Sequence, residues 1–284
     1  MRGAALALCI ALLPALTASS GDASPRLQVE GRLIPGAVLI GSTEPGTTLE
    51  VGGRPVMVGS DGRFVIGLSR RSSSELVIRA NFPDGGSIGF RYPVGEREYL
   101  VTVVEGVPQN TLTPSAEETR RIIAEQVVID AARVRRDDRS DFAHGFIWPV
   151  RGRVSGTYGT ARRYNTEDRL RIHWGLDVAM PVGTPVVAPA DGVITLAESD
   201  LFYSGGTLFL DHGHGMISSF LHLSRLLVAV GDEVHQGQLI GEIGATGRAT
   251  GPHLDWRIRL RGTWLDPATL LAPDDNASVA ENGG

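Results

Sequence analysis

Short alternating runs of apolar and polar residues, separated by glycine-rich turns, occupy the chain from about residue 26 to residue 104. The clearest stretch is residues 47–68, where such runs lie on either side of Gly52-Gly53 and of Gly59-Ser60-Asp61-Gly62. Two-residue Gly-Gly connections suit the turns that match the twist of paired strands. We therefore predict a small antiparallel, β-sandwich-like domain at residues 26–105.

After residue 105 the apolar spacing changes from strand-like to helical. Ser115 and Glu118 form a capping box, which marks the start of a helix. The positions that then recur at helical spacing, up to about Arg136, are Ile122, Ile123, Val127, Val128, Ala131 and Ala132. Residues 106–143 are predicted to be a linker with one amphipathic helix, whose apolar face packs against a neighbouring domain.

Strand-like patterns return after residue 145 and predict a second β domain at residues 145–272. In residues 253–260, alternation separates an apolar face from a polar face that carries His253, Asp255, Arg257 and Arg259. In residues 172–178, His173 and Asp177 are four apart, which places them on one face of a strand. In residues 216–223, His222 is in line with Phe220 and Ser218. Three strands thus carry imidazole or carboxylate groups that can converge.

The overall composition excludes several classes of function. The chain has 284 residues and a net charge of -5, and all 27 basic residues are arginine because the sequence contains no lysine. A pI near 5.8 argues against a nucleic-acid partner, since phosphate binding needs a basic surface. The absence of lysine excludes Schiff-base chemistry and lysine-linked cofactors.

The first 23 residues have the layout of a secretory signal peptide. Met1-Arg2 is followed by an apolar run from Ala4 to Leu13 and by small polar residues up to Ala23. The single cysteine, Cys9, lies inside the apolar run rather than at its end, which disfavours a lipoprotein signal. We expect export to the periplasm or cell envelope, with no membrane anchor after cleavage and no disulfides. The polar tail, residues 273–284, is predicted to be disordered.

Six of the seven histidines lie between His173 and His253. Such a cluster suits zinc, which in catalytic sites takes three nitrogen or oxygen ligands and leaves a fourth position for water. Apart from His173, His222 and His253, the histidines fit structural positions. His212 and His214 lie in a glycine-rich turn, His235 in an exposed loop and His144 in the interdomain connection. The polar residues 162–165, which precede the cluster, either line a groove or form a solvated loop.

Residues from about Trp148 to Asp266 resemble the lysostaphin/LytM-type zinc metallopeptidases, which commonly cut peptidoglycan peptides. The matching stretches, in the family's order, are residues 173–177 (HWGLD), 184–194 (TPVVAPADGVI), 211–215 (DHGHG), 221–224 (LHLS), 234–241 (VHQGQLIG) and 246–254 (TGRATGPHL). The resemblance implies an antiparallel β-sheet peptidase domain. It also implies that His173 and Asp177 are zinc ligands and that His222 and His253 assist the reaction.

One position departs from the family pattern. The family's last motif is His-x-His, whose second histidine is the third zinc ligand, and in this chain that position is Asp255. A carboxylate oxygen can also bind zinc, but the set then carries two negative charges instead of one. We expect one zinc ion held by His173, Asp177 and Asp255, with weaker affinity or with tolerance for a harder divalent metal.

These observations predict an exported, zinc-dependent peptidoglycan hydrolase, a metalloendopeptidase that cleaves peptide bonds of the stem peptides or cross-links. The alternative is a catalytically degenerate module of the same fold that binds peptidoglycan or activates a separate cell-wall hydrolase. A cell-envelope regulatory protein is a further expected partner. A lysine-linked carrier domain is excluded by composition, and a plain adhesion protein leaves the histidine cluster unexplained.

Overall fold

The structure is a computed structural model that describes residues 26–166 and 168–272. The predicted signal peptide, residues 1–23, and the predicted disordered tail, residues 273–284, lie outside the described residues. Within the described part, no helix combines the length and apolar character needed to cross a membrane.

The first region of the chain forms two antiparallel sheets that pack around one core. One sheet has the order β1-β2-β5 and the other β4-β3-β6-β7. The strands are β1 (Leu27–Gly31), β2 (Val38–Thr43), β3 (Thr48–Val51), β4 (Arg54–Val56), β5 (Arg63–Gly67), β6 (Glu75–Asn81) and β7 (Ser87–Pro93). Leu39 and Phe64 of the first sheet share the buried core with Ile78 of the second. The two faces therefore exclude water together, as the alternating pattern predicts.

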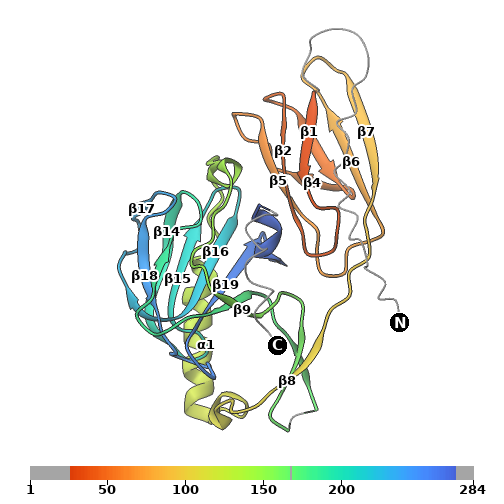
Figure 1. The fold of residues 1–284 in the computed structure, drawn as a ribbon. Helices are drawn as coiled ribbons and strands as arrows, with labels where there is room; N and C mark the ends of the chain where they lie inside the picture. Colours follow the sequence, from red (N-terminus) through yellow and green to blue (C-terminus); the bar gives the residue numbers. More distant parts are fainter. Residues whose placement is uncertain (1–25, 167, 273–284) are drawn as a thin grey trace, which may run out of the picture.

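The second region is dominated by one large sheet with the path β17-β14-β15-β16-β19-β12-β9 (Figure 1). Its strands are β9 (Arg153–Gly156), β12 (Leu176–Ala179), β14 (Gly192–Leu201), β15 (Gly205–Asp211), β16 (Met216–Leu226), β17 (Glu233–Val234) and β19 (His253–Leu260). Beside this path, β18 (Leu239–Ile243) pairs with β13 (Pro185–Val187) and β16, and β20 (Thr263–Leu265) pairs with β19. Phe220, Leu254 and Trp256 are fully buried in its core. The expected mainly β, antiparallel fold is confirmed.

A third, smaller sheet joins the interdomain connection to the second region. β8 (Val101–Val104) lies within the range predicted for the first domain, yet it pairs in parallel with β10 (Ala161–Tyr164), which in turn pairs with β11 (Leu170–Ile172) (Figure 1). The register sets Val101 opposite Ala161 and Val104 opposite Tyr164. The chain that leaves the first region therefore becomes part of the surface of the second.

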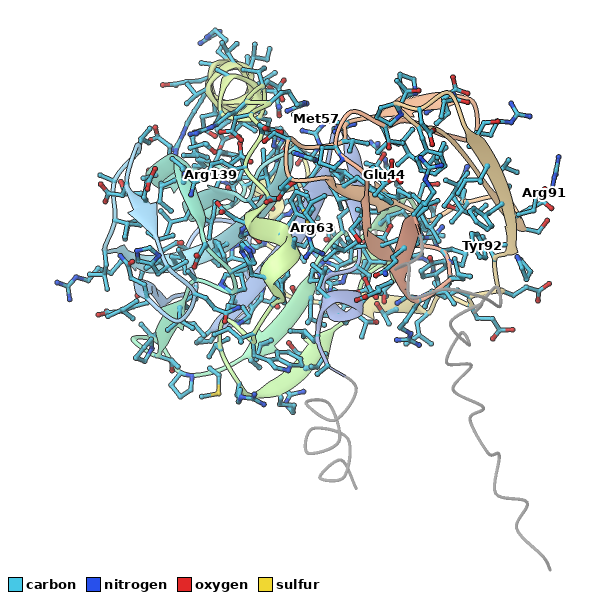
Figure 2. The ribbon with its side chains drawn as sticks, turned by 90° about the horizontal axis from the view of Figure 1, so that it is seen from above. Glu44, Met57, Arg63, Arg91, Tyr92 and Arg139 are labelled. Carbon is cyan, nitrogen blue, oxygen red and sulfur yellow. The ribbon has the colours of Figure 1, made fainter. Side chains whose placement is uncertain are left out.

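The connecting helix α1 (Ala116–Ala131) begins where the capping box predicts but ends before Arg136. Ser115 accepts a hydrogen bond from the Glu118 amide, and the Glu118 side chain accepts one from the Ser115 amide. Most of the predicted apolar face is wrong, since Ile123 and Val127 are 61% and 67% exposed. The helix packs on a small apolar cluster of the large sheet through Ile129, which the prediction did not include, and through Ala132 just beyond its end, which it did. Figure 2 views this helix down its axis, at the edge of the molecule.

Two short 3-10 helices complete the connection, and a third ends the described chain. They are η1 (Gln109–Thr111), η2 (Asp141–His144) and η3 (Pro267–Leu270). The third lies at the junction between the regions, where the Val38 amide donates to Thr269 Oγ1 over 3.1 Å. Nearby, Arg97 pairs with Asp266 at 2.6 Å. Val38 and Val65 are buried in the core of the large sheet, so the two β regions pack against each other directly.

Candidate metal centre and groove

Antiparallel pairing of β12 with β19 places two carboxylates side by side. The register sets Asp177 directly opposite Asp255, and the next pair, Val178 and Leu254, is fully buried on the other face. Residues directly opposite each other on antiparallel strands share a face. The two aspartates therefore point the same way, and both are buried although neither belongs to the apolar core.

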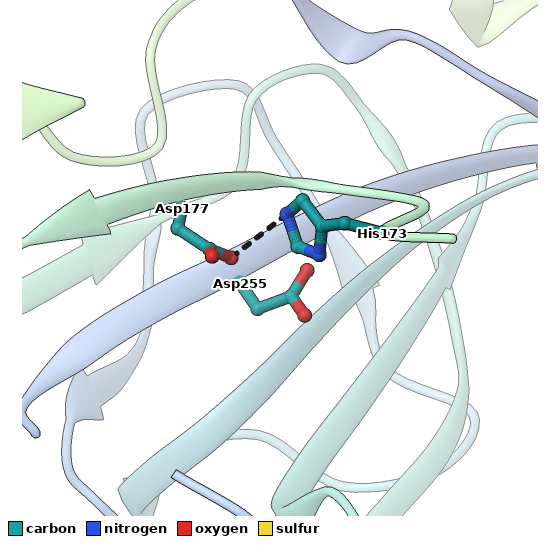
Figure 3. A group of neighbouring side chains, drawn as sticks. All are labelled: His173, Asp177 and Asp255. Atoms are coloured by element: carbon teal, nitrogen blue, oxygen red, sulfur yellow. Dashed lines mark ion pairs between the residues drawn. The ribbon is translucent and has the colours of Figure 1, made fainter. Parts of the chain in front are cut away.

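His173 completes this cluster from a break between two strands. A continuous strand over residues 172–178 is wrong: β11 ends at Ile172 and β12 begins at Leu176. His173 Nε2 lies 3.1 Å from Asp177 Oδ1, and one potential ligand atom from each of His173, Asp177 and Asp255 lies within 4.8 Å of the others. Figure 3 shows the three side chains converging in front of the strands.

Two glycines leave the space that this cluster needs. A Cβ atom at Gly175 would lie 2.0 Å from Asp255 Oδ1, and one at Gly156 would lie 2.4 Å from Asp177 Oδ2. Real Cβ atoms do not approach neighbours so closely, so a larger residue at either position would displace a carboxylate. Gly175 also explains why the chain breaks its strand beside His173.

Each buried carboxylate is paired with its own arginine. Arg162 Nη2 donates to Asp177 Oδ2 over 2.6 Å. Arg257 donates to both oxygens of Asp255, from Nε over 2.9 and 3.1 Å and from Nη2 over 2.5 Å. Burial alone would raise the pKa of Asp255, but the Arg257 guanidinium outweighs it and holds this pKa well below its usual range.

Asp177 is held ionised by a similar balance. Burial and the neighbouring Asp255 carboxylate raise the pKa of Asp177, whereas His173 and Arg162 lower it, and the net direction is downward. Both aspartates are therefore negatively charged, and two guanidinium groups compensate for them. The sequence pattern placed Arg257 on the same strand face as Asp255, but it did not indicate either ion pair.

The orphaned atoms of the cluster fit a divalent cation. His173 Nε2 and Asp177 Oδ1 are both buried, and neither has a hydrogen-bond partner among the described residues. The oxygens of Asp255 accept hydrogen bonds from Arg257, but each carboxylate oxygen has a second lone pair. One nitrogen and two oxygen donors thus face the same point. The imidazole suits zinc, and the two carboxylates suit a harder metal.

His222 reaches the same groove through an irregularity in β16. Strict alternation would place it on the core face with Phe220, which is fully buried, because Leu221 is the residue opposite Asp255. His222 instead has a φ of 66°, in the left-handed region, and the pairing of β15 with β16 shifts register nearby. Both Leu221 and His222 line the groove as a result. The sequence pattern carried no signal for this reversal.

The rings of His222 and His253 lie close together, with centroids 4.8 Å apart. His222 Nδ1 lies 2.8 Å from the Thr246 carbonyl oxygen, and His253 Nδ1 lies 2.8 Å from the Gly251 carbonyl oxygen. A carbonyl only accepts, so Nδ1 carries the proton in each ring and Nε2 is left as the acceptor when the ring is neutral. Burial lowers the pKa of His222 to about 4, so this ring is neutral near pH 7.

These groups line one groove of about 980 Å³. Its floor contains His173, Asp177, His222, His253 and Asp255. One wall is built by the connection before helix α1, through residues such as Thr102 and Val103 of β8. Of the polar segment 162–165, Arg162 and Tyr164 line the groove, and they belong to strand β10 rather than to a loop.

The remaining histidines lie outside this groove. His212 and His214 occupy the turn between β15 and β16, where His212 is buried and bonded through Nδ1 to the Asp191 carbonyl and through Nε2 to Ser218 Oγ, each at 2.7 Å. The His235 side chain is 83% exposed. His144 ends η2 in the interdomain connection. The structure thus brings together the five residues that the resemblance selected.

Comparison with known proteins agrees with this fold and site. The model of peptidase family M23 matches residues 171–267. A solved structure, a putative peptidase M23 from Pseudomonas aeruginosa, is 31% identical, covers 84% of this chain and 95% of that chain, and has a TM-score of 0.62. An antiparallel β domain with a histidine–aspartate groove therefore defines a peptidase of this class. The chain belongs to peptidase family M23.

Curated relatives match over part of this chain. The peptidoglycan DD-endopeptidase ShyC of Vibrio cholerae is 38% identical over 121 residues, which are 43% of this chain and 28% of that protein. The cell division protein DipM of Caulobacter vibrioides is 30% identical over 162 residues, 57% of this chain and 25% of that protein. The chain thus spans only about a quarter of the length of these relatives.

Proposed function

We propose that this protein is an exported, zinc-dependent peptidoglycan hydrolase that cleaves peptide bonds of the stem peptides or cross-links. The observation that carries the proposal is the convergence of His222 and His253 on the cluster of His173, Asp177 and Asp255 in one open groove. The relative ShyC, a peptidoglycan DD-endopeptidase, supports the substrate class. The predicted signal peptide, residues 1–23, supports export to the periplasm or envelope, where this substrate lies.

In this proposal His173, Asp177 and Asp255 hold the zinc ion. The ion, when bound, supplies Lewis acidity, which polarises a carbonyl group and lowers the pKa of water. Arg257 reduces the negative charge that Asp255 adds to the ligand set, so the Asp255–Arg257 pair approaches the neutral charge of the family's histidine. A harder divalent metal is also compatible with two carboxylates and one imidazole.

We assign the general base to His222. Its ring is neutral near pH 7, and the Thr246 carbonyl accepts from Nδ1–H, which leaves the lone pair of Nε2 available to accept a proton. His253 Nε2 lies 4.0 Å from Asp177 Oδ1, so this nitrogen faces the same cluster. We therefore assign His253 to assist the reaction beside His222, where its Nε2 is available to hydrogen-bond a group of the bound substrate.

A specific observation favours the second candidate, a degenerate module that binds peptidoglycan or activates a separate hydrolase. The two buried carboxylates are already neutralised by Arg162 and Arg257, so the charges of these four side chains balance without an ion. DipM is named as a cell division protein, and such a role is compatible with a regulatory module.

A zymogram and a metal analysis distinguish the two candidates. The purified protein, its His173→Ala variant and a His235→Asn control, which changes an exposed histidine, are assayed for clearing of peptidoglycan and for bound zinc. Clearing and bound zinc that are lost only in His173→Ala support the hydrolase. Absence of both in the natural protein, with stimulation of another cell-wall hydrolase, overturns it in favour of the module.

A further inference from the structure

One arginine in the groove differs from the two that pair with aspartates. Arg248 lies in the connection between β18 and β19 and lines the same groove as His222 and His253. Across residues 26–166 and 168–272, no acidic side chain forms an ion pair with it. Its guanidinium lies instead over two aromatic rings, 5.2 Å from the centroid of Tyr164 and 4.8 Å from that of Tyr203.

A half-buried cation without a counter-ion is an unsatisfied group. Burial, together with the nearby Arg171 and Arg257, lowers the pKa of Arg248, although Tyr164 and Tyr203 act in the opposite direction. Aromatic faces attract a cation, but more weakly than a carboxylate does at close range. The group remains charged and has the planar fork that binds a carboxylate through two hydrogen bonds. An anion entering the groove would satisfy it.

The backbone holds Arg248 in a defined place relative to the catalytic side chains. The Arg248 amide donates to the Tyr203 carbonyl over 2.8 Å. Two residues earlier, the Thr246 carbonyl faces His222 Nδ1, while Thr246 Oγ1 accepts from the Gly206 amide over 2.9 Å and donates to the Leu223 carbonyl over 2.9 Å. The segment that positions His222 therefore also positions the Arg248 guanidinium, which is a preorganised arrangement.

We propose that Arg248, clamped by Tyr164 and Tyr203, is a specificity-determining residue that binds a free carboxylate of the substrate peptide near the scissile bond. This inference rests on the proposed hydrolase function and narrows its substrates to anionic peptides. Stem peptides carry free carboxylates, and conversion of these groups to primary amides removes their charge with little change in shape. Arg248 discriminates between the two forms because only the carboxylate offers it a charged, two-oxygen acceptor.

The test compares two synthetic cross-linked stem peptides of one sequence, with carboxylates free or converted to primary amides. We expect the natural protein to hydrolyse the free form with a kcat/KM roughly tenfold to a hundredfold higher, the range of a hydrogen bond to a charged group. Arg248→Met should abolish the preference by lowering kcat/KM for the free form to that of the amidated form, and Arg248→Lys should keep part of the preference. The matched control is Arg163→Met. Arg163 directly precedes Tyr164 in the sequence, but its side chain is exposed and lies outside the groove. This variant should keep the full preference for the free form.

Equilibrium binding of the same two peptides, measured by calorimetry with metal chelated, separates this inference from the hydrolase proposal. If the natural protein hydrolyses neither peptide but binds the free form more tightly through Arg248, the hydrolase function fails and the carboxylate site stands. If it binds and hydrolyses both forms equally, or if the preference survives in Arg248→Met, the inference is overturned. Loss of the preference in Arg153→Met alone, at an exposed arginine elsewhere in the groove, also overturns it.

Discussion

Replacement of Arg257 by methionine tests whether Asp255 is a metal ligand. In the folded protein Arg257 donates three hydrogen bonds to the Asp255 carboxylate, which is only 3% exposed. The methionine keeps the apolar stem but leaves the carboxylate buried without its counter-charge. Loss of one partner of a buried ion pair lowers the free energy of unfolding by about 3–5 kcal/mol. We expect a loss of this size in metal-free protein.

Zinc should reverse much of this loss, because its charge replaces that of the guanidinium beside Asp255. Binding to the folded state alone adds about 1.4 kcal/mol to the free energy of unfolding for each tenfold rise in ion concentration above the dissociation constant. Urea unfolding is measured in chelator and at several zinc concentrations. The difference in free energy of unfolding between Arg257→Met and the natural protein should decrease as the zinc concentration is raised, since the variant binds the ion more tightly.

Arg259→Met is the matched control for this measurement. Arg259 lies two residues along β19 on the same strand face, 5.4 Å from the ring centroid of Trp264, and no acidic side chain of the described residues pairs with it. Its substitution should lower stability by a smaller amount that zinc does not change. If Arg257→Met is equally destabilised with and without saturating zinc, Asp255 is not a ligand and its ion pair is purely structural.

Three further predictions follow from the site and its surroundings. Asp255→His alone should not raise zinc affinity, because it leaves the Arg257 guanidinium beside the ion. The double variant Asp255→His with Arg257→Met should raise zinc affinity roughly tenfold or more in a competition titration. An equal gain in the single variant would contradict the charge argument. His222→Asn should keep the fold by circular dichroism, because asparagine tolerates the left-handed φ of 66°. It should slow hydrolysis of a cross-linked peptide roughly a hundredfold or more. A near-normal rate would exclude His222 as the base. Burial lowers the pKa of His212 from 6.5 to about 4, so its neutral form stabilises the folded state above pH 6.5 and this contribution is lost as the pH falls toward 4. The natural protein should then lose about 2 kcal/mol more than His212→Gln between pH 7.5 and pH 5 in urea unfolding, and parallel pH curves would refute this linkage.

For the helix and the third sheet, the sequence pattern identified the element but not its packing partner. The spacing of Ile123 and Val127 correctly indicates a helix, but both side chains are exposed, because periodicity describes the helix and not the location of its partner. Ile129, which the prediction did not include, makes the contact together with Ala132, which it did. Likewise, β8 has an ordinary strand pattern, and nothing local to it indicates pairing with β10 of the other region.

For the site, alternation within residues 253–260 was sufficient to place Asp255 and Arg257 on one face, and motif order was sufficient to select the five groove residues. These are local properties, since side-chain direction along a single strand follows from the pleat alone. The prediction of a signal peptide and the exclusion of lysine-linked chemistry likewise rest on sequence alone.

Only the tertiary structure decided how these groups meet. The register between β12 and β19 sets Asp177 opposite Asp255, and the left-handed backbone at His222 turns its ring into the groove against the expected alternation. The same packing pairs Arg257 with Asp255 and leaves Arg248 without an acidic partner among the described residues. Register, backbone irregularities and ion pairs depend on contacts between segments far apart in the chain, and a strand pattern carries no information about which neighbour supplies them.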